Sequence, residues 1–461
     1  MTQVEQLARF VTNASYADLS ETARQQLKIR IVDSLACAIG ALAGEPIQMI
    51  HSYLRELGGA PRCTLIAAEQ RTSPERAAFY NSALVRYLDY NDSYLAVGES
   101  CHPSDNLGAV LAAAEYAGRD GRDLLAALAV AYQVQCRLSE VAPVRAKGFD
   151  HTTQGSYAVV AGVAKALGLD PERTAHAIAI SGTAFNALRV TRTGRLSHWK
   201  GLAYPNIAFA GTHAVLLAKQ GITGPLEVFE GNKGFMESIA GPFAIDWSQE
   251  DLERVTRTIL KKYNAEVHSQ SAIEGILELR QQYDLSPEEV EGIDIEIFDV
   301  AYHIIGGGEE GDKAVVRTKE QADHSLPYIV AVALIDGHML PAQYQPERIL
   351  RSDVQDLLKK VTVRPMEALS RRFPEEMPCR LIVKLKDGRE LSKEKQDYEG
   401  FHSRPMQWET VAQKFHHLSE PYTDTSLRHA ILEAVSHLER ISVTELTQLL
   451  SQVKEGIPHG Q

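Results

Sequence analysis

The spacing of apolar residues changes twice along this 461-residue chain, and these changes limit the folds that it can adopt. Up to about residue 265 the pattern is that of successive helices, and Leu27, Ile31, Leu35 and Ile39 recur at every fourth position to form one apolar stripe. Beyond residue 285, segments such as GIDIEIFDV (292–300) alternate apolar and acidic residues, which is typical of a strand with one side in solvent. The helical pattern returns after about residue 400. We therefore expect a mainly α protein with a smaller α+β part.

The pattern divides the chain into three segments. We expect a large all-helical domain over residues 1–267, an α+β domain over 268–400, and a helical tail over 401–461 that packs back on the first domain. Within the α+β domain, CRLIVKLKDGRELSKE (379–394) alternates on both sides of a Lys-Asp-Gly turn and predicts a β-hairpin. ADHSLPYIVAVALIDG (322–337) predicts a helix that is entered through a proline.

Charge and hydropathy exclude several classes of partner. The chain has 48 basic and 60 acidic residues and a net charge of −12, so neither a nucleic-acid backbone nor an anionic membrane is expected as a general partner. GLAYPNIAFAGTHAVLLA (201–218) carries no formal charge, but its proline, asparagine, threonine and histidine favour a buried helix over a membrane span. An anionic substrate would therefore need a local basic pocket.

The cysteines and the start of the chain give the expected compartment. The five cysteines are odd in number and contain no C-x-x-C pair, so a disulfide framework, a zinc ribbon and a local iron–sulfur ligand set are not expected. The first twenty residues, MTQVEQLARFVTNASYADLS, lack the features of a signal or transit peptide. We expect a cytoplasmic protein.

The segment LDYNDSYLAVGESCHPSDN (88–106) gathers acidic and hydroxyl side chains around His102. If Ser104 caps a helix, His102 lies immediately before the positive end of that helix, where an anion is attracted and imidazole can stay neutral, as a base requires. This arrangement suits a carboxylate substrate. The alternative interpretation is that Asp89 and Asp92 are ordinary helix-end and turn residues, Ser104 is only a cap, and His102 has no role.

A second segment, LRVTRTGRLSHWKG (188–201), carries only positive charge. No acidic residue occurs between positions 188 and 226, which is unusual in an acidic chain and makes the segment a candidate for binding carboxylates or phosphates. A solvated loop that faces an acidic partner surface is the alternative. The basic and histidine residues of the segment are Arg189, Arg192, Arg195, His198 and Lys200.

A third segment, KGFDHTTQGSYA (147–158), places His151 before another expected helix. One such histidine is commonly structural, but two at helix starts provide the proton donor and acceptor that addition or elimination needs. Lys261, His268 and Tyr328 could add a cation and polar donors from the second domain, although each taken alone is equally an ordinary surface or core residue.

Common cofactor motifs are absent from the sequence. There is no H-E-x-x-H, and the adjacent His416 and His417 point in different directions on a helix, so no metal site is predicted. No G-x-G-x-x-G follows an expected strand and no G-x-S-x-G occurs, which leaves dinucleotide and serine-hydrolase folds without support.

Several of these segments together resemble the MmgE/PrpD family. LDYNDSY and HPSDNLG, GFDHTT, LSHWKG with PN downstream, FEGNKGF, KKYNAEVHSQSA and ADHSLPY occur in the order and spacing of that family over nearly the whole chain. The family includes 2-methylcitrate dehydratase, cis-aconitate decarboxylase and an iminodisuccinate epimerase. The resemblance implies a homodimer, an all-helical domain built from both chain ends, a smaller α+β lid domain, an active site between the two, and catalysis without a metal or organic cofactor.

The resemblance also implies a set of site residues, by matched motif. The family's aspartate, hydroxyl residue, histidines, lysines and tyrosine fall on Asp89, Ser93, His102, His151, Lys200, Lys261 and Tyr328. One position departs from the decarboxylases, because Glu266 stands where those enzymes carry a histidine. This departure favours the dehydratase branch.

We therefore expect a cofactor-independent dehydratase that acts on 2-methylcitrate, in propionate catabolism, or on citrate, and forms 2-methyl-cis-aconitate or cis-aconitate. His102 is expected to move the proton, His151 or Tyr328 to protonate the leaving hydroxyl, and Asp89 to orient His102. Substrate carboxylates and hydroxyls are expected to bind Lys200, Ser93, Lys261, Arg189, Arg192 and His268. A decarboxylase or epimerase of a related acid and a non-catalytic carboxylic-acid binding protein are the alternatives.

Overall fold

The computed structural model describes residues 1–194, 196–308 and 312–454, and it contains two compact units. Unit 1 comprises Met1–Arg192, His198–Thr258 and the C-terminal segment from Gln407, and unit 2 comprises Thr193–Ser197 and Ile259–Met406. The predicted fold class, mainly α with a smaller α+β part, is confirmed. The units divide at 258/259 and 406/407, whereas the sequence pattern placed these divisions at 267/268 and 400/401.

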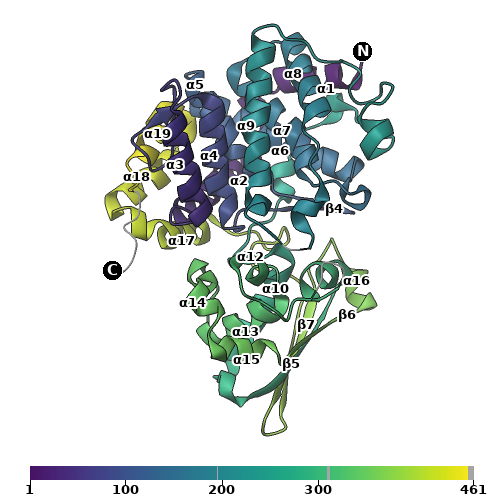
Figure 1. Cartoon of the computed structure of the whole chain (residues 1–461), viewed down its shortest axis with the longest axis vertical. Helices are drawn as coiled ribbons and strands as arrows, with labels where there is room; N and C mark the ends of the chain where they lie inside the picture. The colour runs from purple at the N-terminus through teal and green to yellow at the C-terminus, as the bar shows by residue number, and fades with distance from the viewer. Residues whose placement is uncertain (195, 309–311, 455–461) are drawn as a thin grey trace. The chain divides into compact units, whose positions relative to one another are not determined.

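Unit 1 is built from helices and two short antiparallel hairpins (Figure 1). Its helices up to Thr258 are α1 (Gln3–Asn13), α2 (Glu21–Gly40), α3 (Glu45–Leu57), α4 (Pro74–Tyr87), α5 (Leu107–Tyr116), α6 (Gly121–Val141), α7 (Thr152–Leu167), α8 (Pro171–Ala184) and α9 (Trp199–Lys219). The hairpins pair β1 (Cys63–Thr64) with β2 (Arg71–Thr72), and β3 (Tyr94–Ala96) with β4 (Glu99–Cys101). After the second unit come α17 (Trp408–Ser419), α18 (Thr425–Ser436) and α19 (Val443–Ser451).

The centre of unit 1 is α7, which contacts α5, α6, α8 and α9. Its residues from Thr152 to Leu167 are buried apart from Lys165, because alanine, glycine and valine predominate and allow neighbouring helices to approach closely. The uncharged run 201–218 lies in α9, which packs on α4, α7 and α8. Within the described residues, no helix combines the length and the apolar character that a membrane span requires.

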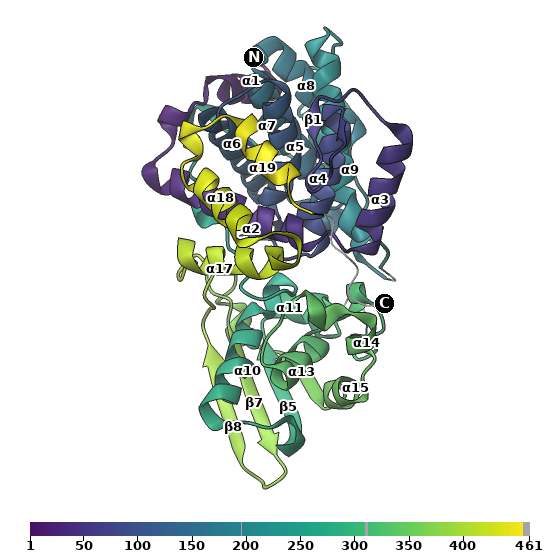
Figure 2. The same ribbon diagram turned by 90° about the vertical axis from the view of Figure 1, so that its left-hand side faces the viewer.

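The C-terminal helices pack against the N-terminal part of the same unit. Helices α17 and α18 contact α2, and α19 contacts α5; Figure 2 shows these yellow helices lying over α2 and α5. A buried ion pair joins them, since Lys414 Nζ lies 2.7 Å from Asp33 Oδ1 on α2. The same ammonium donates to the Tyr90 carbonyl at 2.7 Å. Segments from both ends of the chain therefore share one core.

Replacing Lys414 with methionine is expected to lower the free energy of unfolding by about 3–5 kcal/mol, because the change leaves the Asp33 carboxylate buried without its cation. Burial raises the pKa of Asp33, so the folded variant holds a proton that the unfolded chain releases. The loss should therefore increase as the pH rises above the ordinary carboxyl range. Urea denaturation at several pH values measures it. Lys359→Met removes an exposed pair and should change stability by at most about 1 kcal/mol; equal losses in both variants would contradict this account.

Unit 2 contains a four-stranded sheet with helices on one face. The strand order is β6-β5-β7-β8, with β5 and β6 parallel and the other pairs antiparallel. Ile295 lies opposite Leu381 on one side and Val363 on the other. Helices α10 and α13 cover the sheet through contacts with β6, β7 and β8, and Figure 2 shows both over the strands. The elements are α10 (Gln270–Tyr283), β5 (Val290–Ile297), α11 (Asp299–Ala301), α12 (Lys319–Ala322), α13 (Leu326–Asp336), α14 (Pro346–Ile349), α15 (Ser352–Leu358), β6 (Val361–Pro365), α16 (Glu367–Ser370), β7 (Cys379–Leu385) and β8 (Glu390–Lys395).

Candidate active site

The turn after α4 places a buried carboxylate beside two cations of unit 1. Asp89 adopts a left-handed conformation with φ of 53°, which aspartate tolerates better than most residues. Arg86, in the last turn of α4, donates to Asp89 Oδ1 at 2.7 Å. Lys200 Nζ, from the first turn of α9, lies 3.4 Å from Asp89 Oδ2. The loop of the first motif and the basic segment therefore meet at Asp89.

His102 has a defined tautomer in its neutral form. It follows the β3–β4 hairpin, and its Nδ1 lies 2.8 Å from the Asp92 carbonyl oxygen and 3.0 Å from Ser93 Oγ. A carbonyl oxygen can only accept, so we assign the ring hydrogen to Nδ1 from this contact. The lone pair of the neutral ring then lies on Nε2, which suits a base.

The side chain of Asp92 closes the loop that carries His102. Asp92 Oδ1 accepts from the Ser104 backbone N–H at 3.0 Å, and Oδ2 accepts from the Tyr132 hydroxyl at 2.7 Å. Burial raises the pKa of Asp92, and these two donors oppose the shift. Because the Asp92 backbone orients His102 while its side chain holds Ser104, one residue fixes both ends of the loop.

The prediction that Ser104 caps a helix is wrong in detail. Ser104 lies inside a short 3₁₀ helix, Pro103–Asn106, and α5 begins only at Leu107. Its hydroxyl accepts from Asn91 Nδ2 at 2.8 Å, so it stabilises the loop from the side. His102 nevertheless immediately precedes this helical turn, as predicted.

The side chains of His151, Asp150 and Arg192 form a buried series of contacts. His151 Nδ1 lies 3.3 Å from Asp150 Oδ1, and Asp150 Oδ2 accepts from Arg192 Nε at 2.8 Å. Burial lowers the pKa of His151 to about 3, against the attraction of Asp150 and with the repulsion of Arg192. Burial also works against ionisation of Asp150, but Arg192 and His151 outweigh it and hold the pKa of that carboxyl well below its usual range. His151 is therefore neutral at physiological pH.

The two histidines of unit 1 are neighbours. Their ring centroids lie 5.4 Å apart with an edge-to-face angle of 75°. Tyr204 of α9 stacks beside His151 with centroids 6.4 Å apart, and its hydroxyl is 3.0 Å from both Asn106 Oδ1 and Gln135 Oε1. Two imidazoles from separate motifs thus face one small region of unit 1.

The basic segment is attached to the loop that carries His151. The backbone N–H of Arg189 donates to the Gly148 carbonyl at 2.9 Å, and that of Asp150 donates to the Ala187 carbonyl at 2.9 Å. Arg189 is half-buried, Arg192 is buried and His198 is exposed. Arg195 lies outside the described residues.

Unit 2 contains a second carboxylate–histidine pair. His268 Nδ1 lies 2.6 Å from Glu266 Oε1, and the His268 backbone N–H donates to Glu266 Oε2 at 2.8 Å. Burial works against ionisation of Glu266, but its interactions with His268, His324 and Lys261 hold its pKa below the usual value. Glu266, the residue that departs from the decarboxylase pattern, is therefore the partner of His268 within unit 2, where Lys261 is also buried.

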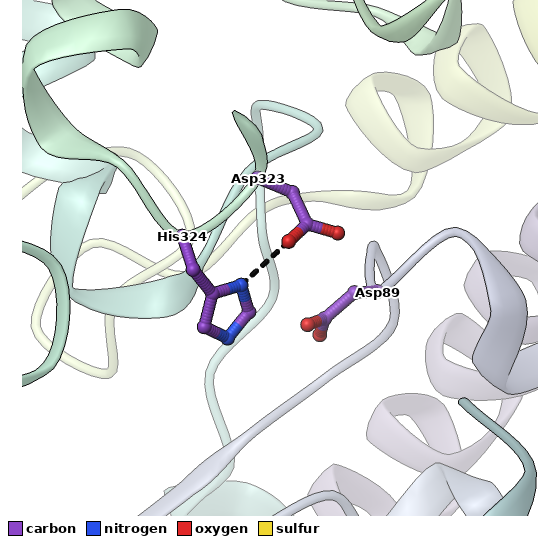
Figure 3. A group of neighbouring side chains, drawn as sticks. All are labelled: Asp89, Asp323 and His324. Atoms are coloured by element: carbon purple, nitrogen blue, oxygen red, sulfur yellow. Dashed lines mark hydrogen bonds and ion pairs between the residues drawn. The ribbon is translucent and has the colours of Figure 1, made fainter. Parts of the chain in front are cut away.

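Tyr328 and a neighbouring acid–histidine pair complete the polar groups of unit 2. The Tyr328 hydroxyl donates to the Gln343 carbonyl, the residue is fully buried, and burial raises its pKa. Asp323 Oδ1 lies 2.6 Å from His324 Nδ1 and Asp323 Oδ2 lies 2.8 Å from Lys319 Nζ; Figure 3 draws the first contact, with Asp89 of unit 1 also labelled.

The sequence indicated some site residues and missed others. In unit 1 the structure gathers Asp89, Ser93, His102, His151, Arg192 and Lys200, and in unit 2 it pairs His268 with Glu266. It also assigns contacts to Arg86, Tyr132 and Asp150, which the sequence analysis did not select. Asp150 carries a signal, since an acid directly precedes the histidine, whereas Tyr132 lies within an apolar helix and has none.

Two family domains match the chain. Residues 5–248 match the MmgE/PrpD N-terminal domain, and residues 263–440 match the MmgE/PrpD C-terminal domain. Together these matches cover most of both units.

Curated relatives carry dehydratase names. A 2-methylcitrate dehydratase from Salmonella typhi is 26% identical over 382 residues, which cover 78% of this chain and 76% of that protein. Alkylcitrate dehydratase phiI from a fungal species is 28% identical over 457 residues, covering 90% of this chain and 86% of that protein. A mitochondrial 2-methylcitrate dehydratase from Yarrowia lipolytica is 26% identical, covering 82% and 76% respectively. Since one relative is named mitochondrial, the cytoplasmic location stays a prediction.

Proposed function

We propose, from the premise that this chain belongs to the MmgE/PrpD family, that it is a hydro-lyase that eliminates water from 2-methylcitrate or citrate. The observation that carries the proposal is the pair of buried, neighbouring imidazoles, 5.4 Å apart, beside the buried cations of α4 and α9. Binding alone requires cations, whereas elimination also requires groups that take and give a proton. The names of the relatives support the same reaction class.

The reaction breaks a C–H bond beside a carboxylate and a C–O bond on the adjacent carbon. The C–H electron pair forms the double bond, and the hydroxyl leaves as water with one added proton. Removing the proton is difficult because negative charge spreads into a group that is already anionic. Fixed cations aimed at that carboxylate lower the barrier, and each preorganised donor of this kind commonly contributes about 3–4 kcal/mol.

The residues take the roles that their contacts support. His102, with its hydrogen on Nδ1, takes the proton through Nε2, and Lys200 and Arg192 bind substrate carboxylates. A substrate with several negative charges raises the pKa of a nearby buried imidazole, so His151 gains a proton when substrate binds and can return it to the leaving hydroxyl. Tyr328 remains the other proton donor predicted from the sequence, and Ser93, Arg189, Lys261 and His268 remain predicted substrate contacts.

The direct test is turnover of a panel of hydroxy acids by purified protein after dialysis against a chelator. We expect 2-methylcitrate or citrate to give an unsaturated tricarboxylate, seen as rising ultraviolet absorbance, at a rate that chelation does not change. Release of carbon dioxide would support a decarboxylase, and loss of optical rotation without a new double bond would support an epimerase. Binding without turnover would support a carboxylic-acid binding protein.

The proposed enzyme is a homodimer, as the family resemblance implies. Light scattering coupled to size-exclusion chromatography tests this assembly, with a mass of twice 50.9 kDa as the expected result.

A further inference from the structure

We infer that Asp150 and Arg192 are positioning residues that hold His151 as the Nδ1–H tautomer and present its Nε2 unprotonated to the substrate. The kinetic consequence of this inference rests on the proposed function, whereas the tautomer can be measured without substrate. Neither residue needs to touch the reacting atoms for this role.

Both oxygens of the Asp150 carboxylate have defined neighbours. Its Oδ1 accepts from the Thr152 backbone N–H at 3.0 Å and lies 3.3 Å from His151 Nδ1, and its Oδ2 accepts from Arg192 Nε at 2.8 Å. The contact with His151 is an ion-pair distance and not a hydrogen bond, but an Nδ1 lone pair would face the negative carboxylate, so the charge of Asp150 favours the ring hydrogen on Nδ1. Because Asp150 is 0% exposed and His151 4% exposed, bulk solvent screens their contact little.

Two side-chain atoms at the ends of the His151–Asp150–Arg192 series have no hydrogen-bond partner. They are His151 Nε2 and Arg192 Nη2, both buried within the described part of unit 1. Protein interiors rarely leave such atoms unsatisfied, and exceptions commonly mark functional sites. An acceptor nitrogen and a cationic donor that share Asp150 suit a ligand that supplies both a proton and a carboxylate.

The charges around His151 favour its neutral form before substrate binds. Asp150 attracts a proton to the ring, while Arg192, Arg86 and Arg189 repel one. The rings of His102 and of Tyr204, on α9, pack against it. Burial and the three arginines together lower the pKa of His151 more than Asp150 raises it, so the ring is neutral and carries one hydrogen. The remaining role of Asp150 is to determine which ring nitrogen carries that hydrogen.

An isosteric substitution separates positioning from simple loss of charge. In Asp150→Asn the amide offers one acceptor and one donor. The contact with Arg192 is charge-assisted and the shortest of the three, so we expect the amide oxygen to keep Arg192. The amide NH₂ then faces His151 Nδ1, and the Thr152 backbone N–H loses its acceptor. That arrangement requires an unprotonated Nδ1 and moves the ring hydrogen to Nε2.

The measurement is the nitrogen chemical shifts of histidine in ¹⁵N-histidine-labelled protein without substrate, with His151 assigned by its loss in His151→Gln. We expect Nδ1–H in the wild type and Nε2–H in Asp150→Asn. In Asp150→Asn/Arg192→Met the oxygen is released and Nδ1–H should return. Asp170→Asn is the matched control, because Asp170 also accepts a backbone N–H and pairs with an arginine, Arg173, but is exposed and bonds no histidine.

Kinetics add a second readout. With the proposed substrate, kcat of Asp150→Asn should fall about 10²- to 10⁴-fold, the usual contribution of one positioned acid or base. A wild-type ring protonated on Nε2, or an unchanged tautomer in Asp150→Asn, overturns the inference whatever the rates. Absence of turnover in the wild type overturns the proposed function and leaves the tautomer result standing.

Discussion

Replacing His102 with glutamine is expected to lower kcat for water elimination by about 10²- to 10⁴-fold, with a much smaller change in KM. The glutamine amide keeps a similar volume and can still donate toward the Asp92 carbonyl, so the loop should stay closed. It cannot, however, accept a proton as imidazole does. Initial rates of absorbance change across substrate concentrations measure both constants, and circular dichroism checks the fold.

The control for this substitution is His213→Gln. His213 is exposed on α9, about 20 Å along the helix from its first turn, so the same chemical change there should leave kcat within experimental error. A His102→Gln enzyme that retains at least half of the wild-type kcat would contradict the role of His102 and leave His151 as the only proton-transferring imidazole of unit 1.

Elements with a clear period were predictable from the sequence, and elements without one were not. The alternation of Ile293, Ile295 and Ile297 predicted β5, and the Lys-Asp-Gly turn predicted the β7–β8 hairpin. Strand β6 was not predicted, because its alternation of half-buried and exposed residues spans only five positions and includes only two apolar residues on the half-buried side, Val361 and Val363. The β3–β4 hairpin was missed because two strands of three residues are too short to show a period.

The candidate site shows the same division between local and long-range information. The position of His102 and of His151 before a helical turn is a local property, and the sequence indicated both. Their separation of 5.4 Å depends on how α6, α7 and α9 pack, and no local pattern contains that distance. Tyr132 illustrates the limit, because its place in an apolar helix predicts a core residue, while its hydroxyl holds the loop of His102 through Asp92.

The acidic partners of the basic segment were not predicted, for a related reason. The basic segment predicted that Arg192 and Lys200 bind substrate anions, but the folded chain also gives each a buried carboxylate partner, Asp150 and Asp89. The sequence of a segment gives the sign of its charge. It does not show which acidic residues other elements place beside that segment in the fold. A mutation at either cation therefore changes both substrate binding and the charge balance of the site, and a single variant cannot separate the two effects.

Lys200→Met, combined with Asp89→Asn, separates them. If Lys200 stabilises charge on the substrate carboxylate in the transition state, Lys200→Met should lower kcat/KM by about 10²- to 10³-fold, as removal of one preorganised donor does. The methionine preserves the buried stem, and Arg86 still pairs with Asp89 at 2.7 Å, so the fold should be retained. Lys219→Met, which removes an exposed lysine from the last turn of the same helix, should leave kcat/KM unchanged.

The double variant decides between the two roles of Lys200. If the lysine only neutralises Asp89, then Lys200→Met/Asp89→Asn should recover most of the lost kcat/KM, because no uncompensated carboxylate remains to repel the substrate. If Lys200 binds the substrate directly, the double variant should stay at least as impaired as Lys200→Met. We expect the second result, since a substrate with several carboxylates needs the cation whether or not Asp89 is ionised. Recovery to within about threefold of wild type, a difference of less than 1 kcal/mol, would assign Lys200 to the support of Asp89 instead.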